Sequence, residues 1–488
     1  MNASDISRHL LDDASVRQFL IDGSIQVRAD FPDDIHGRLY SGLEHLFATG
    51  NPGNNILPQL PELGAIYQHP AVRGALTSLL GPGYFMHPHR FCHLHNPGNS
   101  DQKWHKDDYI YDLNVRHHRF RWVMAFYYPQ DVTDDMGPTS TIPGRQHYNS
   151  ISDPDPQKAT ETACLHSGQA GTVTIVNFDS WHGRAPNQSD RKRYMLKFMF
   201  GRMHEPTAPA WNCSELDWNS SSPAPLQRSV WNWLTGRPAE RDRSTGESRC
   251  EALLCDLEHE KEERRLDAAY QIATLGSSAV PELVQTLKRQ VATATVESSP
   301  ANPKGANPAD MSALHALCAV GPEAVPAMID LLSPGADSDS RSRCAAVAVL
   351  GNFGPVAADG VDALAAAMED ADAFVRRNAA EALGTVGVYT DKAADALVKS
   401  VADEDRMVRW NALLAIARLG AVMSDDTNGR IDDAVPAISA ALSDPDRYAR
   451  FYAELALQQI ATPRAHSTLI EHLRTSHWCP LTTIDSPY

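Results

Sequence analysis

Two histidines and an aspartate, carried by two motifs far apart in the chain, have the residue types and spacing of a metal site. The first motif, 104–107, reads Trp-His-Lys-Asp, and the second, 181–183, reads Trp-His-Gly. On an extended segment, side chains at positions i and i+2 point to the same side, so His105 and Asp107 can reach one metal ion. His182, from a distant strand, would complete a face of two histidines and one carboxylate. Such a face leaves coordination positions open on iron(II), as oxygen activation requires.

An arginine eleven residues beyond His182 is suited to binding a carboxylate. Arg193 ends the basic cluster 191–193 and precedes the apolar run Tyr194–Phe200. Its planar guanidinium can pair with a carboxylate through two parallel hydrogen bonds. We therefore predict that Arg193 binds the far carboxylate of 2-oxoglutarate, whose keto-acid end would chelate the iron. Arg191, on the same face of the strand, is the competing candidate.

The elements that must position these residues change in kind along the chain. Residues 1–82 have mostly helical periodicity, whereas residues from about 84 to 203 form short aromatic and β-branched runs broken by Pro, Gly and Asn or Asp turns. Runs of this kind predict an antiparallel barrel or sandwich. Residues 204–245 are rich in Trp, Ser and Pro, which favours a packed connector.

From about residue 250 onward the sequence repeats itself. An Ala- and Leu-rich helix recurs, ending at Gly276, Gly321, Gly351, Gly384 and Gly420. Asp-rich turns would cap the next helix, the glycines suit left-handed C-caps, and Pro stands near the start of each second helix. Helical hairpins of this length bury little alone and must stack on their neighbours. The segment resembles HEAT repeats of the PBS-lyase type.

A series of short motifs between residues 84 and 202 matches one known family in order and spacing. The motifs are Asn96-Pro97-Gly98, Trp104-His105-Lys106-Asp107-Asp108, Met136-Gly137-Pro138-Thr139, Pro143-Gly144-Arg145-Gln146-His147, Gly171-Thr172-Val173, His182-Gly183, Asn187-Gln188-Ser189 and Arg193. Together they resemble the phytanoyl-CoA dioxygenase family of iron(II)/2-oxoglutarate enzymes. Two positions depart from the family, which usually has Asn before Gly137 and Ser before His147.

The resemblance implies a site and a set of cofactors. Its iron ligands, which are also the catalytic residues, would be His105, Asp107 and His182, and Arg193 would hold 2-oxoglutarate. The family often has a lysine near the position of His95 that touches 2-oxoglutarate, so His95 is a further co-substrate candidate. The cofactors implied are Fe(II), 2-oxoglutarate and O2, with ascorbate as the reductant in vitro. Halogenating relatives have Gly or Ala at the position of Asp107, so hydroxylation is the expected reaction, with desaturation or ring closure as alternatives.

These patterns predict a multidomain α+β protein. Residues 1–245 would form an oxygenase domain, a double-stranded β-helix (jelly-roll or cupin-like) barrel with flanking helices, with its core at about 84–203 and a connector at 204–245. Residues 246–488 would form an all-α solenoid of HEAT-like repeats.

The first functional hypothesis is a dioxygenase that oxidises an aliphatic C–H of a small-molecule metabolite, releasing succinate and CO2. Tyr109, Tyr111 and Trp122 are candidates for lining the substrate pocket. One alternative is a hydroxylase of a protein or carrier-bound substrate that the repeats present. Another is a HEAT scaffold whose barrel is inactive, against which the intact set of site residues weighs.

Composition narrows the location and the partners. The N-terminal 20 residues are acidic where a signal peptide would be basic, which favours a cytoplasmic protein. The eight cysteines are scattered and favour reduced thiols. Residues 246–488 carry 35 acidic and 21 basic side chains, a balance of −14. This charge argues against nucleic acid as a partner, and no apolar run is long enough to predict a membrane span.

Overall fold

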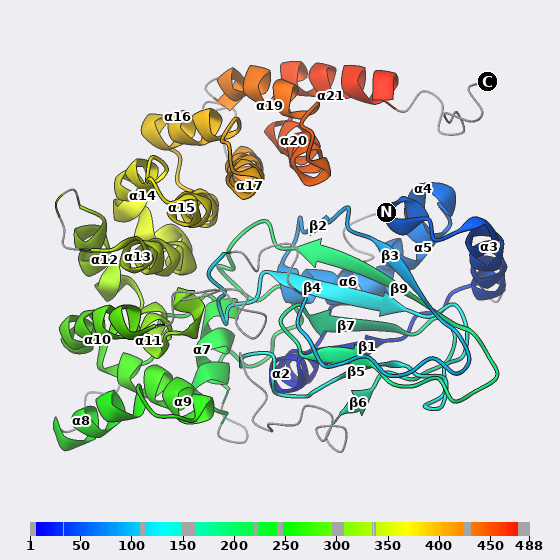
Figure 1. Cartoon of the computed structure of the whole chain (residues 1–488), viewed down its shortest axis with the longest axis horizontal. Coiled ribbons are helices and arrows are strands. Elements are labelled where there is room, and N and C mark those ends of the chain that lie inside the picture. Colours follow the sequence, from blue (N-terminus) through cyan, green and yellow to red (C-terminus); the bar gives the residue numbers. More distant parts are fainter. Residues whose placement is uncertain are drawn as a thin grey trace. The chain divides into compact units, whose positions relative to one another are not determined.

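The computed structural model describes residues 6–32, 34–107, 114–148, 163–218, 223–241, 247–294, 307–333, 335, 338–422 and 431–476. The chain forms two compact units (Figure 1). Unit 1 comprises Met1–Tyr109 and His117–Thr274, and unit 2 comprises Ile110–Arg116 and Leu275–Tyr488. Unit 1 thus extends beyond residue 245, where the sequence places the end of the oxygenase domain. The domain boundary at residues 245 and 246 stays a prediction.

Unit 1 contains a large antiparallel sheet. Its strands, in spatial order, are β1 (Ser24–Val27), β7 (Val173–Asn177), β4 (Trp122–Tyr127), β9 (Arg193–Gly201) and β2 (Phe85–Met86), and β3 (Phe91–His95) also pairs with β9. Every residue of β4 and β9 is buried. Central strands covered on both faces account for the continuous apolar runs in these parts of the sequence.

A second, three-stranded sheet carries part of the site. Its order is β6 (Cys164–Leu165), β5 (Thr139–Thr141) and β8 (His182–Arg184), again with antiparallel pairs. Two antiparallel sheets with flanking helices are the double-stranded β-helix that the sequence predicts, so the expected fold class is confirmed for this region. The helices of unit 1 are α2 (Asp13–Asp22), α3 (Ile35–Thr49), α4 (Ile56–Gln59), α5 (Leu63–Gln68), α6 (Pro70–Leu80), α7 (Pro225–Leu234), α8 (Glu247–Asp256) and α9 (Glu262–Ile272), with a 3-10 turn at Gly53–Asn55.

Aromatic side chains fix these helices to the sheet and to the connector. Tyr67 of α5 stacks on Phe198 of β9, with ring centroids 4.1 Å apart. Trp211 and Trp218 of the connector both pack against Trp231 of α7, which is fully buried. The connector is therefore packed, as its tryptophan content predicts.

Unit 2 is helical, as expected for HEAT repeats. Its helices are α10 (Val280–Thr293), α11 (Ser312–Val320), α12 (Val325–Leu332), α13 (Ser340–Phe353), α14 (Val361–Ala367), α15 (Ala373–Val386), α16 (Asp391–Ser400), α17 (Arg406–Val422), α19 (Val435–Ala441), α20 (Arg447–Ile460) and α21 (Pro463–Ser476). The first helices of successive repeats, α13, α15, α17 and α20, pack side by side. The Asp caps are confirmed: Asp339, Asp372 and Asp446 each accept a hydrogen bond from the first turn of the helix they precede.

The C-cap role predicted for the glycines is wrong for Gly351, Gly384 and Gly420. They lie inside helices α13, α15 and α17, and none has a positive φ. A Cβ on Gly384 would lie 2.8 Å from the Cα of Ala415 in the next repeat. These glycines recur because neighbouring helices approach closely, and the positive φ falls three residues later, at Gly354 and Gly387.

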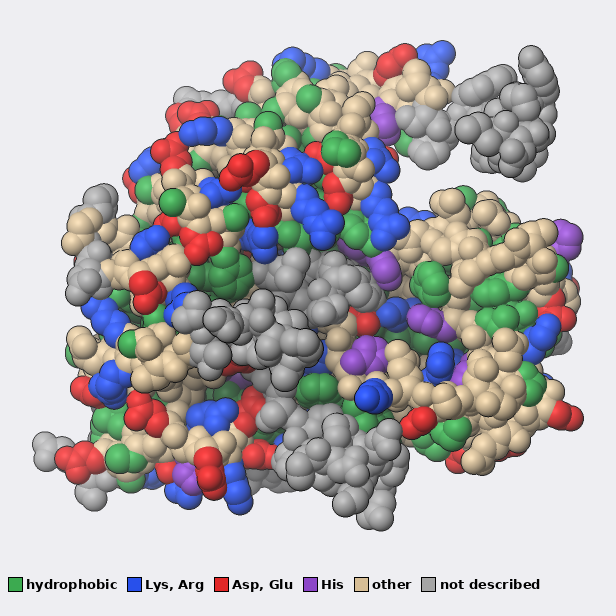
Figure 2. Space-filling view, viewed as in Figure 1, with side chains coloured by type: hydrophobic (Ala, Val, Ile, Leu, Met, Phe, Trp, Pro, Cys, Tyr) green, Lys and Arg blue, Asp and Glu red, His purple; other side chains and the backbone are tan. Residues whose placement is uncertain are grey.

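Ion pairs link consecutive repeats. The pairs are Arg343–Asp370, Arg376–Asp403 and Arg409–Asp444, with N–O distances of 2.7, 2.9 and 2.7 Å. On the face seen in Figure 2, acidic and basic side chains lie interspersed over the repeats. Several acidic side chains of this half therefore pair with arginines and join one repeat to the next.

One stretch of the described residues, Ser340–Ala367, is long and apolar enough to pass for a membrane span. It corresponds to α13, α14 and the turn between them, and 78% of its apolar window is buried in the structure. This burial identifies the stretch as the apolar core of the repeats.

Candidate metal and co-substrate site

The two histidines of the predicted triad are joined through their backbones. His105 and His182 form an isolated antiparallel bridge in which each N–H donates to the other's carbonyl, at 3.0 and 2.9 Å. His182 is the first residue of β8. The bridge therefore adds the motif around His105 to the edge of the small sheet, and it places two residues 77 positions apart in direct register.

Both histidine rings are oriented by carbonyl groups near them in sequence. Nδ1 of His105 lies 3.0 Å from the Lys103 carbonyl, and Nδ1 of His182 lies 3.0 Å from the Ser180 carbonyl. A carbonyl only accepts, so each Nδ1 must carry the proton and each Nε2 presents a lone pair. This is the tautomer that a metal-binding histidine needs.

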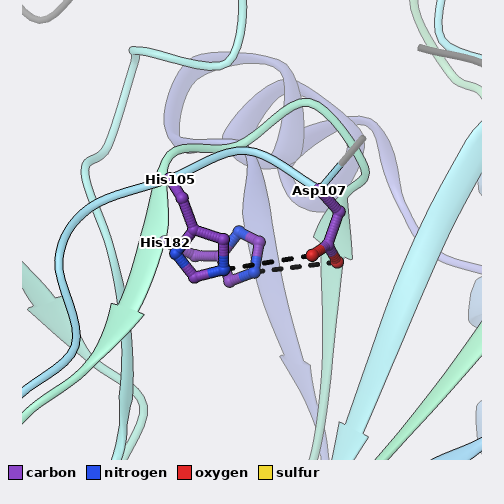
Figure 3. A group of neighbouring side chains, drawn as sticks. All are labelled: His105, Asp107 and His182. Atoms are coloured by element: carbon purple, nitrogen blue, oxygen red, sulfur yellow. Dashed lines mark ion pairs between the residues drawn. The ribbon is translucent and has the colours of Figure 1, made fainter. Parts of the chain in front are cut away.

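Asp107 completes the group (Figure 3). Its Oδ1 lies 3.9 Å from Nε2 of His105, and its Oδ2 lies 3.7 Å from Nε2 of His182. One ligand atom from each of the three residues falls within 4.8 Å of the others, and no other such group occurs among the described residues. Burial lowers the pKa of His182 to about 4, so its ring is neutral near pH 7. Donor types, tautomers and separations all fit one divalent ion.

A lysine that the sequence reasoning missed is paired with the carboxylate. Nζ of Lys197, in β9, donates to Oδ2 of Asp107 at 2.8 Å, and both side chains are buried. Burial by itself raises the pKa of Asp107, but the Lys197 ammonium and the neighbouring histidines hold it well below the ordinary value. Lys197 stands four residues beyond Arg193, so the two share one face of the strand. That even spacing is the signal by which the lysine could have been found.

Arg193 lies in the same cavity as the triad. The cavity has a volume of about 290 Å3, and its lining includes His105, Asp107, His182, Arg193 and Lys197. Arg193 is 1% exposed, and its Nε and Nη1 have no hydrogen-bond partner among the described residues. Burial lowers the pKa of this guanidinium, so the fold bears the cost of desolvating a cation. Arg191, its competitor, is exposed and does not line the cavity.

His95, the weaker co-substrate candidate, pairs directly with Arg193 across β3 and β9. Its Nε2 lies 3.1 Å from the Ala185 carbonyl, and the residue is fully buried without lining the cavity. Burial, together with the Arg193 cation, lowers the pKa of His95 to about 4. A Cβ at position 137 would lie 2.7 Å from this ring, so Gly137, with a φ of +68°, is required for the packing.

The remaining sequence candidates have other surroundings. Trp122 packs edge-on against Phe85 in the sheet and does not line the cavity. Tyr109 and Tyr111 lie outside the described residues. His89 and His93 also line the cavity. Burial, with the Lys197 and Arg193 cations, lowers the pKa of His93 to about 3, so this ring is also neutral.

Comparison with known proteins agrees with this geometry. Residues 42–195 match the profile described as Phytanoyl-CoA dioxygenase (PhyH), and residues 325–417 match the profile of HEAT repeats. No curated protein matches the chain at a significant level.

Three of the similar solved structures are the following. AviO1 from Streptomyces viridochromogenes Tue57 is 16% identical over 38% of this chain and 93% of that one, with a TM-score of 0.31. The non-heme alpha-ketoglutarate-dependent carbocyclase SnoK from nogalamycin biosynthesis is 17% identical over 40% and 85%, with a TM-score of 0.33. HygX from Streptomyces hygroscopicus, solved with nickel and 2-oxoglutarate bound, is 14% identical over 39% and 87%, with a TM-score of 0.33.

The fold, the candidate triad and the profile match define the class. The chain carries an iron(II)- and 2-oxoglutarate-dependent oxygenase domain of the double-stranded β-helix type. More specifically, residues 42–195 are a phytanoyl-CoA dioxygenase family domain, followed in the same chain by HEAT repeats. The predicted pairing of these two families is confirmed.

Proposed function

We propose that the chain oxidises an aliphatic C–H bond of a small-molecule metabolite, with hydroxylation as the default outcome and succinate and CO2 as co-products. His105, Asp107 and His182 would hold iron(II), and Arg193 would hold the far carboxylate of 2-oxoglutarate. One observation carries the proposal: three metal-donor side chains converge in a cavity that also holds a buried arginine with two unpaired nitrogens.

Bound iron(II) with 2-oxoglutarate would supply oxygen activation, the step that side chains alone cannot perform. The chain's own residues do the positioning. The carbonyls of Lys103 and Ser180 keep Nε2 of the two histidines free of protons. Lys197 holds the Asp107 carboxylate ionised in a buried position, ready to act as a ligand. With a carboxylate at this position there is no vacant place for a halide, which supports hydroxylation.

The charge of the cavity supports an anionic substrate. Its described lining includes three cations, Arg184, Arg193 and Lys197, against the single anion Asp107. An iron(II) ion and a 2-oxoglutarate dianion cancel each other, which leaves the lining with an excess of positive charge. Buried charge without a partner is unfavourable. A carboxylate or phosphate on the substrate would compensate it, so acidic metabolites are the first class to test.

The test is 2-oxoglutarate turnover to succinate by anaerobically purified protein given Fe(II), O2 and ascorbate. We expect slow turnover without substrate, abolished in His105→Ala and Arg193→Ala and retained in Arg191→Ala, whose side chain is exposed. Acidic metabolites should then raise the rate more than neutral analogues. Absence of both succinate formation and Fe(II)-dependent 2-oxoglutarate binding in the wild type would refute the proposal.

The alternative is a protein or carrier-bound substrate presented by the repeats, and it is supported by the HEAT profile match alone. The same assay separates the two. Stimulation by peptides or carrier-bound compounds, and by no free metabolite, would favour the alternative.

A further inference from the structure

A short piece of the oxygenase sequence belongs to the helical unit. Ile110–Arg116 is part of unit 2, although the chain on both sides of it, ending at Tyr109 and resuming at His117, is part of unit 1. Within this piece Asn114 and Val115 are fully buried. Six residues separate Asp107, the proposed iron ligand, from Asn114.

Polar side chains of the repeats hold this piece through hydrogen bonds. The Val115 N–H donates to Oδ1 of Asn378 at 2.9 Å. Nδ2 of Asn114 donates to Oε2 of Glu381 at 2.8 Å and to Oδ1 of Asn411 at 3.3 Å. Backbone and side chain of the piece are thus both engaged.

The side chains of the two asparagines of the repeats are oriented by hydrogen bonds within their own helices. Asn378 and Asn411 occupy equivalent positions in consecutive repeats, in the stretches VRRNA and VRWNA of α15 and α17. Nδ2 of each donates to the carbonyl four residues earlier, at 2.7 and 2.8 Å, which fixes the amide and turns Oδ1 away from its own helix turn. The acceptor atoms are therefore oriented by the repeats themselves, before any contact with the piece.

A third asparagine, just before the 3-10 helix Pro308–Asp310, also contacts Asn114. Asn307, 2% exposed, donates from Nδ2 to the Asn114 carbonyl at 3.3 Å, and its Oδ1 accepts from the Ala309 N–H at 2.9 Å. If position 114 only had to be packed, an apolar side chain would be sufficient there. The Asn114 side-chain amide instead donates to one carboxylate and one amide oxygen, which indicates that an asparagine is recognised at this position.

We propose that the helical unit acts as an intramolecular clamp on the oxygenase chain, and that its partner is this chain's own Asn114 and Val115. Asn114 follows Asp107 after six residues, so holding Asn114 in place limits the positions that Asp107 can take. Asn378, Asn411 and Glu381 are then positioning residues for the metal site. This role rests on the proposed function, because it assumes that Asp107 binds the metal.

The experiment compares Asn378→Ala with Thr385→Ala in the full chain. Thr385 is a buried polar residue on the same helix, and it bonds to the Gly351 carbonyl and not to the clamped piece. Hydrogen exchange is measured at residues 114–116, and Ni(II)-dependent binding of 2-oxoglutarate is measured by anaerobic calorimetry. Both variants should lower the melting temperature of the repeats. Only Asn378→Ala should speed exchange at 114–116, by about tenfold for one lost hydrogen bond, and weaken Ni(II) and 2-oxoglutarate binding several-fold.

The clamp would be overturned by unchanged exchange at 114–116 in Asn378→Ala, or by faster exchange with unchanged Ni(II) and 2-oxoglutarate affinity. Equal effects of both substitutions would also refute it, because they would report only loss of repeat stability. A wild type that binds neither Ni(II) nor 2-oxoglutarate would instead contradict the oxygenase proposal, and exchange at 114–116 would still report whether the repeats hold the piece.

Discussion

Two buried arginines, one in each unit, differ in what they face. Arg193 in the barrel has two guanidinium nitrogens without a hydrogen-bond partner among the described residues. Arg376 in the repeats, 9% exposed, donates from Nε and Nη2 to both oxygens of Asp403, at 2.9 and 3.0 Å. The fold satisfies the Arg376 cation internally, whereas two nitrogens of Arg193 have no partner among the described residues. The proposed function assigns these two nitrogens to a ligand, and the complete pairing of Arg376 joins one repeat to the next.

The contrast between Arg193 and Arg376 is tested most directly by replacing each arginine in turn. Arg193→Met should weaken Ni(II)-dependent 2-oxoglutarate binding by about 10- to 100-fold, the loss expected for charge-assisted hydrogen bonds of about 1.5–3 kcal/mol. It should leave stability unchanged or raised, because it removes a desolvated charge. Calorimetric titration and denaturant unfolding measure the two effects.

Arg376→Met is the matched control and should do the reverse. It leaves Asp403 partly buried without its partner, so the repeats should lose about 2–3 kcal/mol of stability, and 2-oxoglutarate affinity should stay within twofold of the wild type. If Arg193→Met destabilised the fold as much as Arg376→Met and left co-substrate affinity intact, Arg193 would be architectural and the contrast would fail.

The sequence predicts the parts of the candidate site that depend on local spacing. The His-x-Asp motif predicted two donors on one side of an extended segment, and the structure brings Asp107 to both histidines. The sequence favours Arg193 over Arg191 because it enters the apolar strand, and the structure adds that Arg193 is buried and Arg191 exposed. The contacts of Val115 with Asn378 and of Asn114 with Asn411 could not be predicted, since they pair residues more than 260 positions apart with no shared motif.

The repeat glycines were misassigned for a related reason. A glycine after an apolar helical run satisfies the local requirement of a C-cap, and sequence alone offers no sign of the neighbouring helix. The structure shows why glycine is needed at position 384: the helix of the next repeat lies too close to leave room for a side chain. Repeat stacking therefore selects glycine inside the helix, where helix propensity disfavours it.

Glycines inside helices give a second contrast between the units, with a smaller expected change in the free energy of unfolding. Gly384→Ala would place a Cβ 2.8 Å from the Ala415 Cα, so the helices must separate, and we expect a loss of about 1–3 kcal/mol. Gly37→Ala, in α3 of unit 1, has nothing within 4 Å of the added Cβ and should gain up to about 1 kcal/mol from helix propensity. Denaturant unfolding of the two variants should move in opposite directions, and a gain at Gly384 would show that the glycine is not required for stacking.

The last prediction concerns the acid stability of unit 1, where the buried carboxylate of Asp13 is paired on both oxygens. Asp13 accepts hydrogen bonds from the Trp211 indole at 2.7 Å, from the Ser214 hydroxyl at 2.7 Å and from the backbone N–H groups of Ser214 and Glu215 at 2.9 Å each. Burial alone would raise the pKa of Asp13, but these donors outweigh it and lower the pKa from 3.8 to about 2.

Because the folded-state pKa lies below the unfolded one, ionised Asp13 stabilises the fold fully above about pH 4, and this contribution is lost as the pH falls from about 4 to 2. Asp13→Asn should therefore be less stable than the wild type at pH 7, by about 1–2 kcal/mol, and the difference should shrink as the pH approaches 2. Denaturant unfolding at pH 7, 4 and 2.5 measures it. A difference that stays constant over this range would mean that Asp13 stabilises the fold without any contribution from its charge, which would contradict the prediction.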